Sequence, residues 1–344
     1  MNRKVVIIGW DCAAPLLVFN RFREDLKNTS RITAKGCYGK LRSVIPPITI
    51  PAWRCMVTGK TPGELGLWGF RHRIDNSYSD FSIPTSNFLK SDAIWDILGR
   101  HGKKSICSSV PPSYPPYEVN GHLIGCFMTP DTSKAYTYPA GLRNEINSLV
   151  GDYQVDTVFR VEDKNGIKKS AFEMTDKHFT VFEHLLRNKE WDFAMHVEIG
   201  LDRIQHAFWR YLDETHHLHE AFSEYKDVIL DYYRLLDERL GRIMELIDEE
   251  TLLLVVSDHG AKAMKGAFCV NQWLINEGYL KLNSKPEPGQ RIQNADVDWK
   301  RSKAWGWGGY YSRIFFNVKG RERQGRISSR KLPKEIERLK KKIV

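Results

Sequence analysis

The chain is poor in cysteine, and its six cysteines are scattered over 344 residues without a CxxC pair. This spacing argues against a disulfide or zinc framework and favours free thiols. There is also no apolar stretch of the length that spans a bilayer, and residues 1–10 enter a strand-like apolar run with no cleavable signal before it. We therefore expect a cytoplasmic protein.

The charge is moderately one-sided, with 52 basic and 42 acidic residues and a formal net charge of +10. A positive balance suits an anionic substrate through long-range attraction. The segment from Lys319 to Lys342 is dense in Lys and Arg, but no recognisable nucleic-acid-binding module accompanies it. We expect neither nucleic acid nor a membrane as a partner, and the sequence does not indicate an oligomeric state.

One apolar run ends in two potential metal ligands. Five Leu and Val residues at 252–256 are followed, after a serine, by Asp258, His259 and a glycine. A short apolar run of this kind is typical of a strand buried on both faces, as in a parallel sheet. Ligands in such sheets collect beyond the carboxyl ends of the strands. The alternatives are that Asp258 caps a following helix and that His259 is an ordinary core histidine.

The same pattern occurs at two other places in the chain. Apolar residues 5–8 lead through a Gly-Trp pair to Asp11, and residues 193–197 lead to Asp202, with His206 four residues later. If a helix begins near Asp202, residues four apart share one face, so these two side chains can converge on one ion. Three expected strands therefore end in carboxylate or imidazole donors, which chance placement of polar residues rarely produces.

A hydroxyl group lies between prolines in residues 46–53, Pro-Pro-Ile-Thr-Ile-Pro-Ala-Trp. Because proline is tolerated in the first turn of a helix, we expect Thr49 at or next to the N-terminus of a helix that starts near Pro51. One interpretation is an N-cap threonine without a chemical role. The other is that the helix N-terminus favours a phosphate, and that contact with a metal ion lowers the hydroxyl pKa and makes Thr49 a nucleophile.

Five motifs occur in a particular order: Gly9-Trp10-Asp11, Thr49 with Pro51-Ala52-Trp53 and Thr58-Gly59-Lys60, Asp202 with His206, Ser257-Asp258-His259-Gly260, and Asn317-Val318-Lys319-Gly320-Arg321-Glu322. In this order they resemble the alkaline phosphatase superfamily, specifically its type I phosphodiesterase/nucleotide pyrophosphatase branch. The resemblance implies a site with two divalent ions, usually zinc. One ion would be surrounded by Asp11, Thr49, Asp258 and His259. The other would take Asp202, His206 and a further histidine.

The chain departs from the family pattern at that further histidine. None of its eleven histidines follows His259, although the family's last metal histidine lies well downstream of the Asp-His pair. We expect that the chain ends before the family's C-terminal part, because residues 333–343 have an amphipathic helix pattern that no Gly, Asn or Pro ends. The alternative is a divergent site that uses a water or another histidine, such as His196 or His72.

The alternation of strand and helix patterns predicts an α/β fold with a mainly parallel sheet and helices on both faces, as in alkaline phosphatases. Strands are expected at 4–9, 38–44, 104–109, 122–127, 192–198, 252–257 and 313–318. Helices are expected at 14–27, 52–59, 91–101, 170–188, 203–212 and 219–249. We expect one domain over residues 1–344, C-terminally truncated, with residues 110–170 as an inserted cap. The alternative for that segment is a long surface excursion.

The chemistry implied is hydrolysis of a phosphodiester or pyrophosphate bond in a small, anionic phosphorylated metabolite or nucleotide. Two divalent ions can clamp a phosphoryl group while Thr49 attacks in line. Zinc fits the nitrogen and carboxylate donors, and manganese also accepts these ligand types. The alternatives are a phosphomonoesterase, phosphomutase or phosphotransferase on the same scaffold, and a noncatalytic protein that binds metal or phosphate. The sequence identifies no further substrate-binding residue.

Overall fold

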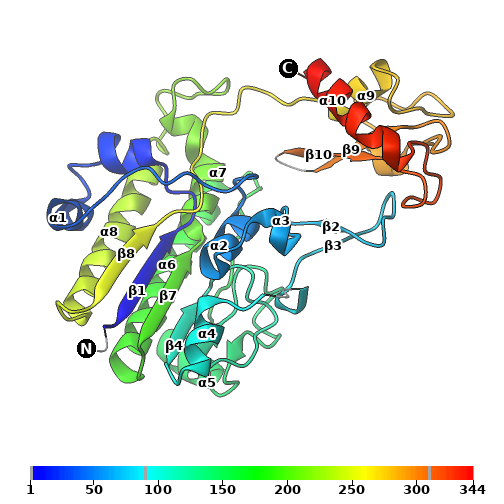
Figure 1. The fold of residues 1–344 in the computed structure, drawn as a ribbon. Coiled ribbons are helices and arrows are strands. Elements are labelled where there is room, and N and C mark those ends of the chain that lie inside the picture. Colours follow the sequence, from blue (N-terminus) through cyan, green and yellow to red (C-terminus); the bar gives the residue numbers. More distant parts are fainter. Residues whose placement is uncertain (1–2, 89–90, 309–310, 344) are drawn as a thin grey trace. The chain divides into compact units, whose positions relative to one another are not determined.

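The computed structural model describes residues 3–88, 91–308 and 311–343 and divides the chain into two compact units (Figure 1). The first unit consists of residues 1–70 and 84–265, and the second of residues 71–83 and 266–344. All the residues expected to act as nucleophile or metal ligands belong to the first unit. Among the described residues, no helix has the length and apolar character needed to cross a lipid bilayer.

A six-stranded sheet forms the centre of the first unit, with strand order β6-β5-β4-β7-β1-β8. Neighbouring strands are parallel except β5 and β6, which are antiparallel. The strands are β1 Val5–Trp10, β4 Ser105–Ser108, β5 Gly121–Ile124, β6 Thr137–Tyr138, β7 Phe193–Glu198 and β8 Leu252–Val256. The expected mainly parallel sheet is confirmed, and β1 lies between β7 and β8 although these three strands are far apart in the sequence.

Helices cover both faces of this sheet. The helical elements described in the first unit are the π-helix η1 Leu17–Arg21, α1 Lys27–Lys35, α2 Thr49–Thr58, α3 Pro62–Leu65, the 3₁₀ turn η2 Ser86–Phe88, α4 Ile94–Arg100, α5 Leu142–Val150, α6 Lys164–Asn188, α7 Gly200–Leu212 and α8 Val228–Leu246. Residues from α6, α7 and α8 share one apolar cluster, and residues from α2 and α4 share another.

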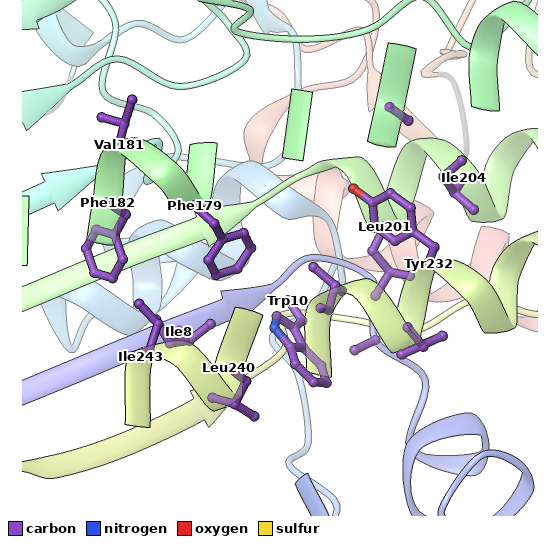
Figure 2. Packing of buried hydrophobic residues seen from close by; sticks show 14 of the residues in the cluster. Ile8, Trp10, Phe179, Val181, Phe182, Leu201, Ile204, Tyr232, Leu240 and Ile243 are labelled. Atoms are coloured by element: carbon purple, nitrogen blue, oxygen red, sulfur yellow. The ribbon is translucent and has the colours of Figure 1, made fainter. Parts of the chain in front are cut away.

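Strand β1 shows why both faces are covered. All of its residues except Gly9 carry large apolar side chains, and successive side chains of a strand point to opposite faces. Ile8 and Trp10 therefore pack in the cluster with α6, α7 and α8 (Figure 2), while Ile7 packs in the cluster with Trp53 of α2. Each fully buried side chain of this size contributes about 1.5–3 kcal/mol, so the sheet is held from both sides.

Three elements expected from the sequence are wrong. Residues 38–44 do not form a strand, because their side chains, including Tyr38 and Leu41, are mostly exposed and a strand there would bury little. The helix expected at 14–27 is replaced by η1 and α1, because Asp237 of α8 accepts hydrogen bonds from the N–H of Asn28 at 2.9 Å and thereby fixes the start of α1. The helix expected at 219–249 begins only at residue 228, because the chain turns where His219 Nδ1 donates to Arg210 O at 2.8 Å.

Residues 110–170 extend the sheet and do not stand apart from it. They carry β5, β6, α5 and the start of α6, all within the first unit. Their role as a cap over the site stays a prediction.

The second unit has its own small core. Strand β9 Ala304–Gly308 pairs antiparallel with β10 Ser312–Phe316, and β2 His72–Arg73 pairs with β3 Phe81–Ser82. The helical elements are α9 Val270–Asn276, η3 Ile292–Asn294, η4 Ser329–Lys331 and α10 Leu332–Ile343. Helix α10 confirms the amphipathic pattern, and its Leu339 is buried with the fully buried Trp305.

Candidate active site

The carboxyl ends of three neighbouring strands bring the candidate residues together. Strands β7, β1 and β8 run parallel and in register. Asp11 follows the last residue of β1, Asp258 comes two residues after β8, and Asp202 lies in the first turn of α7, just after β7. Because parallel strands share one carboxyl edge, side chains from three distant parts of the sequence meet there.

Asp11, Thr49, Asp258 and His259 form the first cluster. Thr49 Oγ1 lies 3.1 Å from His259 Nε2 and 3.5 Å from Asp11 Oδ1. His259 Nε2 also lies 3.3 Å from Asp258 Oδ2 and 3.6 Å from Asp11 Oδ1. Asp11, Thr49 and Asp258 are buried, whereas the His259 side chain is partly exposed. His259 Nε2 therefore lies close to one side-chain oxygen each of Thr49, Asp11 and Asp258.

Helix α2 places Thr49 beside this cluster. The residue before it, Ile48, has extended dihedral angles (φ −128°, ψ 139°), so Thr49 is the first helical residue and not the N-cap. Pro51 lies in the first turn, where the missing N–H breaks no helical hydrogen bond. The first amide groups of α2 and the positive end of its dipole therefore lie next to the Thr49 hydroxyl, an arrangement that favours an anion.

Trp53, one helical turn after Thr49, holds Asp11 in place. It is fully buried, and its Nε1 donates to Asp11 Oδ2 at 2.7 Å, which leaves Oδ1 toward Thr49. This close approach requires glycine at position 9, because a Cβ there would lie 2.6 Å from the Trp53 ring and 2.8 Å from Val197. The Gly-Trp-Asp and Pro-Ala-Trp motifs therefore depend on each other.

Hydrogen bonds join the segments that follow β1 and β8. The Cys12 N–H donates to Asp258 Oδ1 at 3.1 Å, and the Ala13 N–H donates to Ser257 Oγ at 2.8 Å. The Ser257 hydroxyl in turn donates to His259 O at 2.8 Å. The positions of Asp258 and His259 are thus tied to the chain that carries Asp11.

Asp202 and His206 form the second cluster on successive turns of α7. Asp202 Oδ1 lies 3.3 Å from His206 Nε2, as the spacing of four residues predicts. Asp202 Oδ2 accepts a hydrogen bond from Arg203 at 2.8 Å, and Arg203 makes two further bonds of 2.8 Å to Asp156. The Arg203 guanidinium also lies 4.6 Å from the centre of the Phe159 ring. Arg203 therefore occupies one oxygen of Asp202 and leaves the other facing His206.

The electrostatics of the site favour a cation. Burial and the charge of Asp258 raise the pKa of Asp11 well above its ordinary value, and burial raises the pKa of Asp258 to about 8. Burial also opposes ionisation of Asp202, but the hydrogen bond and charge of His206, together with Arg203, outweigh it and lower the Asp202 pKa. Buried carboxylates ionise together when a cation compensates their charge, so this cluster is suited to hold one.

The donor atoms fit a metal ion. Three groups of residues each bring their donor atoms within 4.8 Å of one another: Asp11-Asp258-His259, Cys12-Asp202-His259 and His178-His196-Glu198. Asp258 Oδ2 is buried and lacks a hydrogen-bond partner among the residues that the structure describes, and a divalent ion would satisfy it. Carboxylates and imidazoles are common ligands of zinc, and both also occur around manganese.

One of the two alternative histidines, His196, lies in a group separate from Asp202 and His206. His196 is fully buried in β7, with Nδ1 3.0 Å from Ser108 Oγ and Nε2 3.6 Å from Glu198 Oε2. His72 belongs to the second unit. In the part of the chain that the structure describes, Cys12 is instead the residue grouped with Asp202 and His259. The sequence offered one signal for it, its position directly after Asp11.

The family follows from comparison of the whole sequence. Residues 5–344 match the family described as type I phosphodiesterase / nucleotide pyrophosphatase. The chain belongs to this family. The resemblance seen in the motifs is thus confirmed. No curated protein shows significant sequence similarity to the chain.

Solved structures with a similar fold include two of phosphonoacetate hydrolase from Sinorhizobium meliloti 1021. The one in complex with phosphonoformate has a TM-score of 0.57 and 16% sequence identity. The match covers 80% of this chain and 62% of the hydrolase chain. The one in complex with phosphonoacetate has a TM-score of 0.58 and 15% sequence identity. The match covers 84% of this chain and 66% of the hydrolase chain. These matches confirm the alkaline phosphatase-like fold, and the chain spans less than two thirds of either structure's length.

Proposed function

We propose that this chain hydrolyses phosphodiester or pyrophosphate bonds in a small phosphorylated metabolite or nucleotide, with Thr49 as the nucleophile. The observation that carries the proposal is the position of Thr49 Oγ1 at the start of α2, 3.1 Å from His259 Nε2 and 3.5 Å from Asp11 Oδ1. Bound divalent ions, with zinc as our first choice, would polarise the phosphoryl group and lower the pKa of the attacking hydroxyl. Membership of the family supports this chemistry.

The proposed ligands fall into two sets. One ion would be held by Asp11, Thr49, Asp258 and His259, and the other by Asp202 and His206. In the first set, the hydrogen bonds around Ser257 tie the segment of Asp11 to that of Asp258 and His259, and Trp53 ties α2 to Asp11. We therefore expect the first ion to be held more firmly than the second.

The residues of the chain would act on the substrate in two steps. The Thr49 O–H bond would break with its proton passing to solvent, Oγ1 would form a bond to phosphorus, and the ester oxygen opposite it would leave with the bonding electrons. Water would then hydrolyse the phosphothreonine and restore the hydroxyl. The amide groups at the start of α2 would bind nonbridging phosphoryl oxygens, and Trp53 would keep Asp11 in its orientation through the 2.7 Å hydrogen bond.

Hydrolysis of an aryl phosphodiester with added zinc or manganese tests this proposal. Thr49→Ala should abolish turnover while metal binding persists, and Thr49→Ser should keep part of the turnover because it keeps a hydroxyl. Thr58→Ala is the matched control, since Thr58 lies at the other end of α2, where its hydroxyl donates to Arg54 O at 2.7 Å. Retained turnover in Thr49→Ala would disprove the nucleophile assignment.

The competing functions are separated by substrate preference and metal content. A phosphomonoesterase, phosphomutase or phosphotransferase would process monoesters faster than diesters in the same assay. A noncatalytic binding protein would hold metal or phosphate without turnover. Two ions per chain together with diester hydrolysis would support the function proposed here.

A further inference from the structure

A further group of side chains that can bind a metal, His178, His196 and Glu198, lies inside the first unit. His178 belongs to α6, and the other two belong to β7. Because His196 and Glu198 are two residues apart on a strand, their side chains point to the same face of the sheet. All three side chains are buried, with 1%, 0% and 0% exposed. The group shares no residue with the two ligand sets proposed above.

The spacing of the donor atoms in this group fits a zinc ion. Glu198 Oε2 lies 3.1 Å from His178 Nδ1 and 3.6 Å from His196 Nε2. Each residue has a donor atom within 4.8 Å of a donor atom of the other two. A tetrahedral zinc ion about 2.0–2.1 Å from each donor holds its ligands about 3.3 Å apart. Both distances to Glu198 Oε2 are close to that value, so an ion requires little movement of the side chains.

The Nε2 atom of His196 indicates that the group binds a ligand. It is buried and has no hydrogen-bond partner among the residues that the structure describes, since 3.6 Å to Glu198 Oε2 is too long for a hydrogen bond. Leaving such an atom unpaired costs about 1–3 kcal/mol. The rings of Phe179 and Phe182 pack against the imidazole, with centres 4.9 and 5.2 Å from its centre. The imidazole is therefore held in place while its Nε2 lacks a partner.

The other ring nitrogen of each histidine already faces an oxygen atom. His178 Nε2 donates to Gln154 O at 2.6 Å, and His196 Nδ1 lies 3.0 Å from Ser108 Oγ. Histidines that bind metal usually donate their second ring N–H to an oxygen in this way, which fixes the ring and its tautomer. When His196 Nδ1 donates to Ser108, its Nε2 carries the free electron pair that a metal needs.

We propose that His178 Nδ1, His196 Nε2 and Glu198 Oε2 bind a buried zinc ion that is distinct from the ions of the candidate active site. Without the ion, His178 Nδ1 carries a proton that Glu198 accepts in a hydrogen bond. On binding, this N–H bond breaks, a nitrogen–zinc bond forms, and the proton passes to the solvent. Two imidazoles and one carboxylate are an established ligand set for zinc, with a fourth position for a water.

The ion links α6 to the end of β7 that precedes α7. Glu198 Oε1 accepts the N–H of Gly200, the first residue of α7, at 2.8 Å, so Oε2 is the oxygen that faces the histidines. Because the ligands are almost completely buried, the ion enters as the chain folds and leaves only when this region opens. We therefore expect it to resist removal by a chelator.

The zinc content of the full chain tests this site in a background that weakens both sites of the candidate active site. The background carries Asp11→Asn, Asp202→Asn and His259→Ala. The protein is produced in medium with added zinc and dialysed against a chelator, and its bound zinc is measured by inductively coupled plasma mass spectrometry. We expect one zinc ion per chain in this background. Adding His196→Gln should remove it.

Two further variants in the same background serve as controls. His184→Gln is the matched control for a histidine, because His184 also lies on α6 but pairs with Glu145 at 2.7 Å. It should keep the ion. Ser108→Ala keeps all three ligands and removes the oxygen that faces His196 Nδ1. It should weaken zinc binding by about 10-fold, measured by competition with a chelator of known affinity.

X-ray absorption at the zinc edge gives a readout that leaves the group unchanged. In the background variant we expect nitrogen and oxygen ligands with two imidazoles. The candidate active site offers only one imidazole there, that of His206, because His259 has been replaced. This measurement decides the question if circular dichroism shows that His196→Gln does not fold.

The outcomes separate this inference from the proposed function. A folded background variant that retains no zinc would overturn the inference, as would zinc that persists in folded His196→Gln. A zinc spectrum with a sulfur ligand or with fewer than two imidazoles would also overturn it. Diester hydrolysis is measured separately on the wild-type chain. Its presence leaves the proposed function intact when the buried zinc site fails, and its absence leaves the buried zinc site intact.

Discussion

The buried pair of Glu198 and His178 supports the turn that carries the second cluster. Glu198 ends β7, and its Oε1 accepts the N–H of Gly200, the first residue of α7, at 2.8 Å, two residues before Asp202. Its Oε2 accepts a hydrogen bond from His178 Nδ1 at 3.1 Å, while His178 Nε2 donates to Gln154 O at 2.6 Å. Because both ring nitrogens of His178 face acceptors, the imidazole carries both protons and a positive charge.

The pKa values agree with this charged pair. Burial opposes protonation of His178, but the charge and hydrogen bond of Glu198 outweigh it and raise the His178 pKa. Burial likewise opposes ionisation of Glu198, but the charge and hydrogen bond of His178 lower the Glu198 pKa well below its ordinary value. The two side chains are 1% and 0% exposed, so solvent screens the interaction little.

The magnitude follows from what each substitution leaves behind. Glu198→Ala removes one partner of a buried ion pair, which costs about 3–5 kcal/mol. Glu198→Gln can still accept from Gly200 and donate to a neutral His178. The free energy of unfolding should then fall by the difference between a charged and a neutral hydrogen bond to His178, about 1 kcal/mol. We expect both variants to lower the free energy of unfolding, in that order.

The pH dependence has a defined sign. The lowered pKa of Glu198 contributes stability that is present above the ordinary value of 4.5 and is lost in acid as pH falls through the lowered pKa. The raised pKa of His178 contributes stability that is present below the ordinary value of 6.5 and is lost as pH rises through the raised pKa. The difference between wild type and Glu198→Gln should therefore be largest between pH 4.5 and 6.5 and should shrink at alkaline pH.

Chemical denaturation followed by far-ultraviolet circular dichroism measures these differences. Glu145→Ala is the matched control, because Glu145 also pairs with a histidine, His184, at 2.7 Å but is 33% exposed. Exposed pairs contribute about 0–1 kcal/mol, so the control should change stability little. A loss below about 1 kcal/mol in Glu198→Ala, or a difference between wild type and Glu198→Gln that does not change with pH, would refute the reasoning.

Three other substitutions test the surroundings of the site. Gly9→Ala should lower the free energy of unfolding by about 1–3 kcal/mol, measured by thermal unfolding, because its Cβ would lie 2.6 Å from the Trp53 ring. Trp53→Phe removes the hydrogen bond to Asp11 Oδ2 and should weaken binding of the first zinc ion by about 10-fold, measured by equilibrium dialysis; unchanged affinity would contradict this role. Arg203→Lys keeps the charge but loses the forked contact with Asp156 that fixes the group bound to Asp202. Binding of the second zinc ion should weaken by about 10–100-fold, and an unaltered dialysis curve would argue against that orientation.

The mainly parallel sheet could be predicted because local patterns report it. Buried parallel strands favour apolar runs, and such runs stand out at residues 5–8 and 252–256 and, interrupted by His196, at 193–197. The place of Thr49 could be predicted for a similar reason, since prolines restrict the backbone of their own neighbourhood. Another expectation from local sequence was wrong, because residues 38–44, expected as a strand, have no buried face in the fold.

By itself, the sequence determined the three strands β1, β7 and β8, the acidic and imidazole residues that follow them, and the family to which those motifs belong. Only the tertiary structure decided how these ends meet and which other side chains join them. Arg203 and Asp156 lie 47 residues apart, and Cys12 lies 193 residues from Gln205. No local pattern encodes such contacts, because they depend on the order of strands in the sheet and on the crossover helices that close around it.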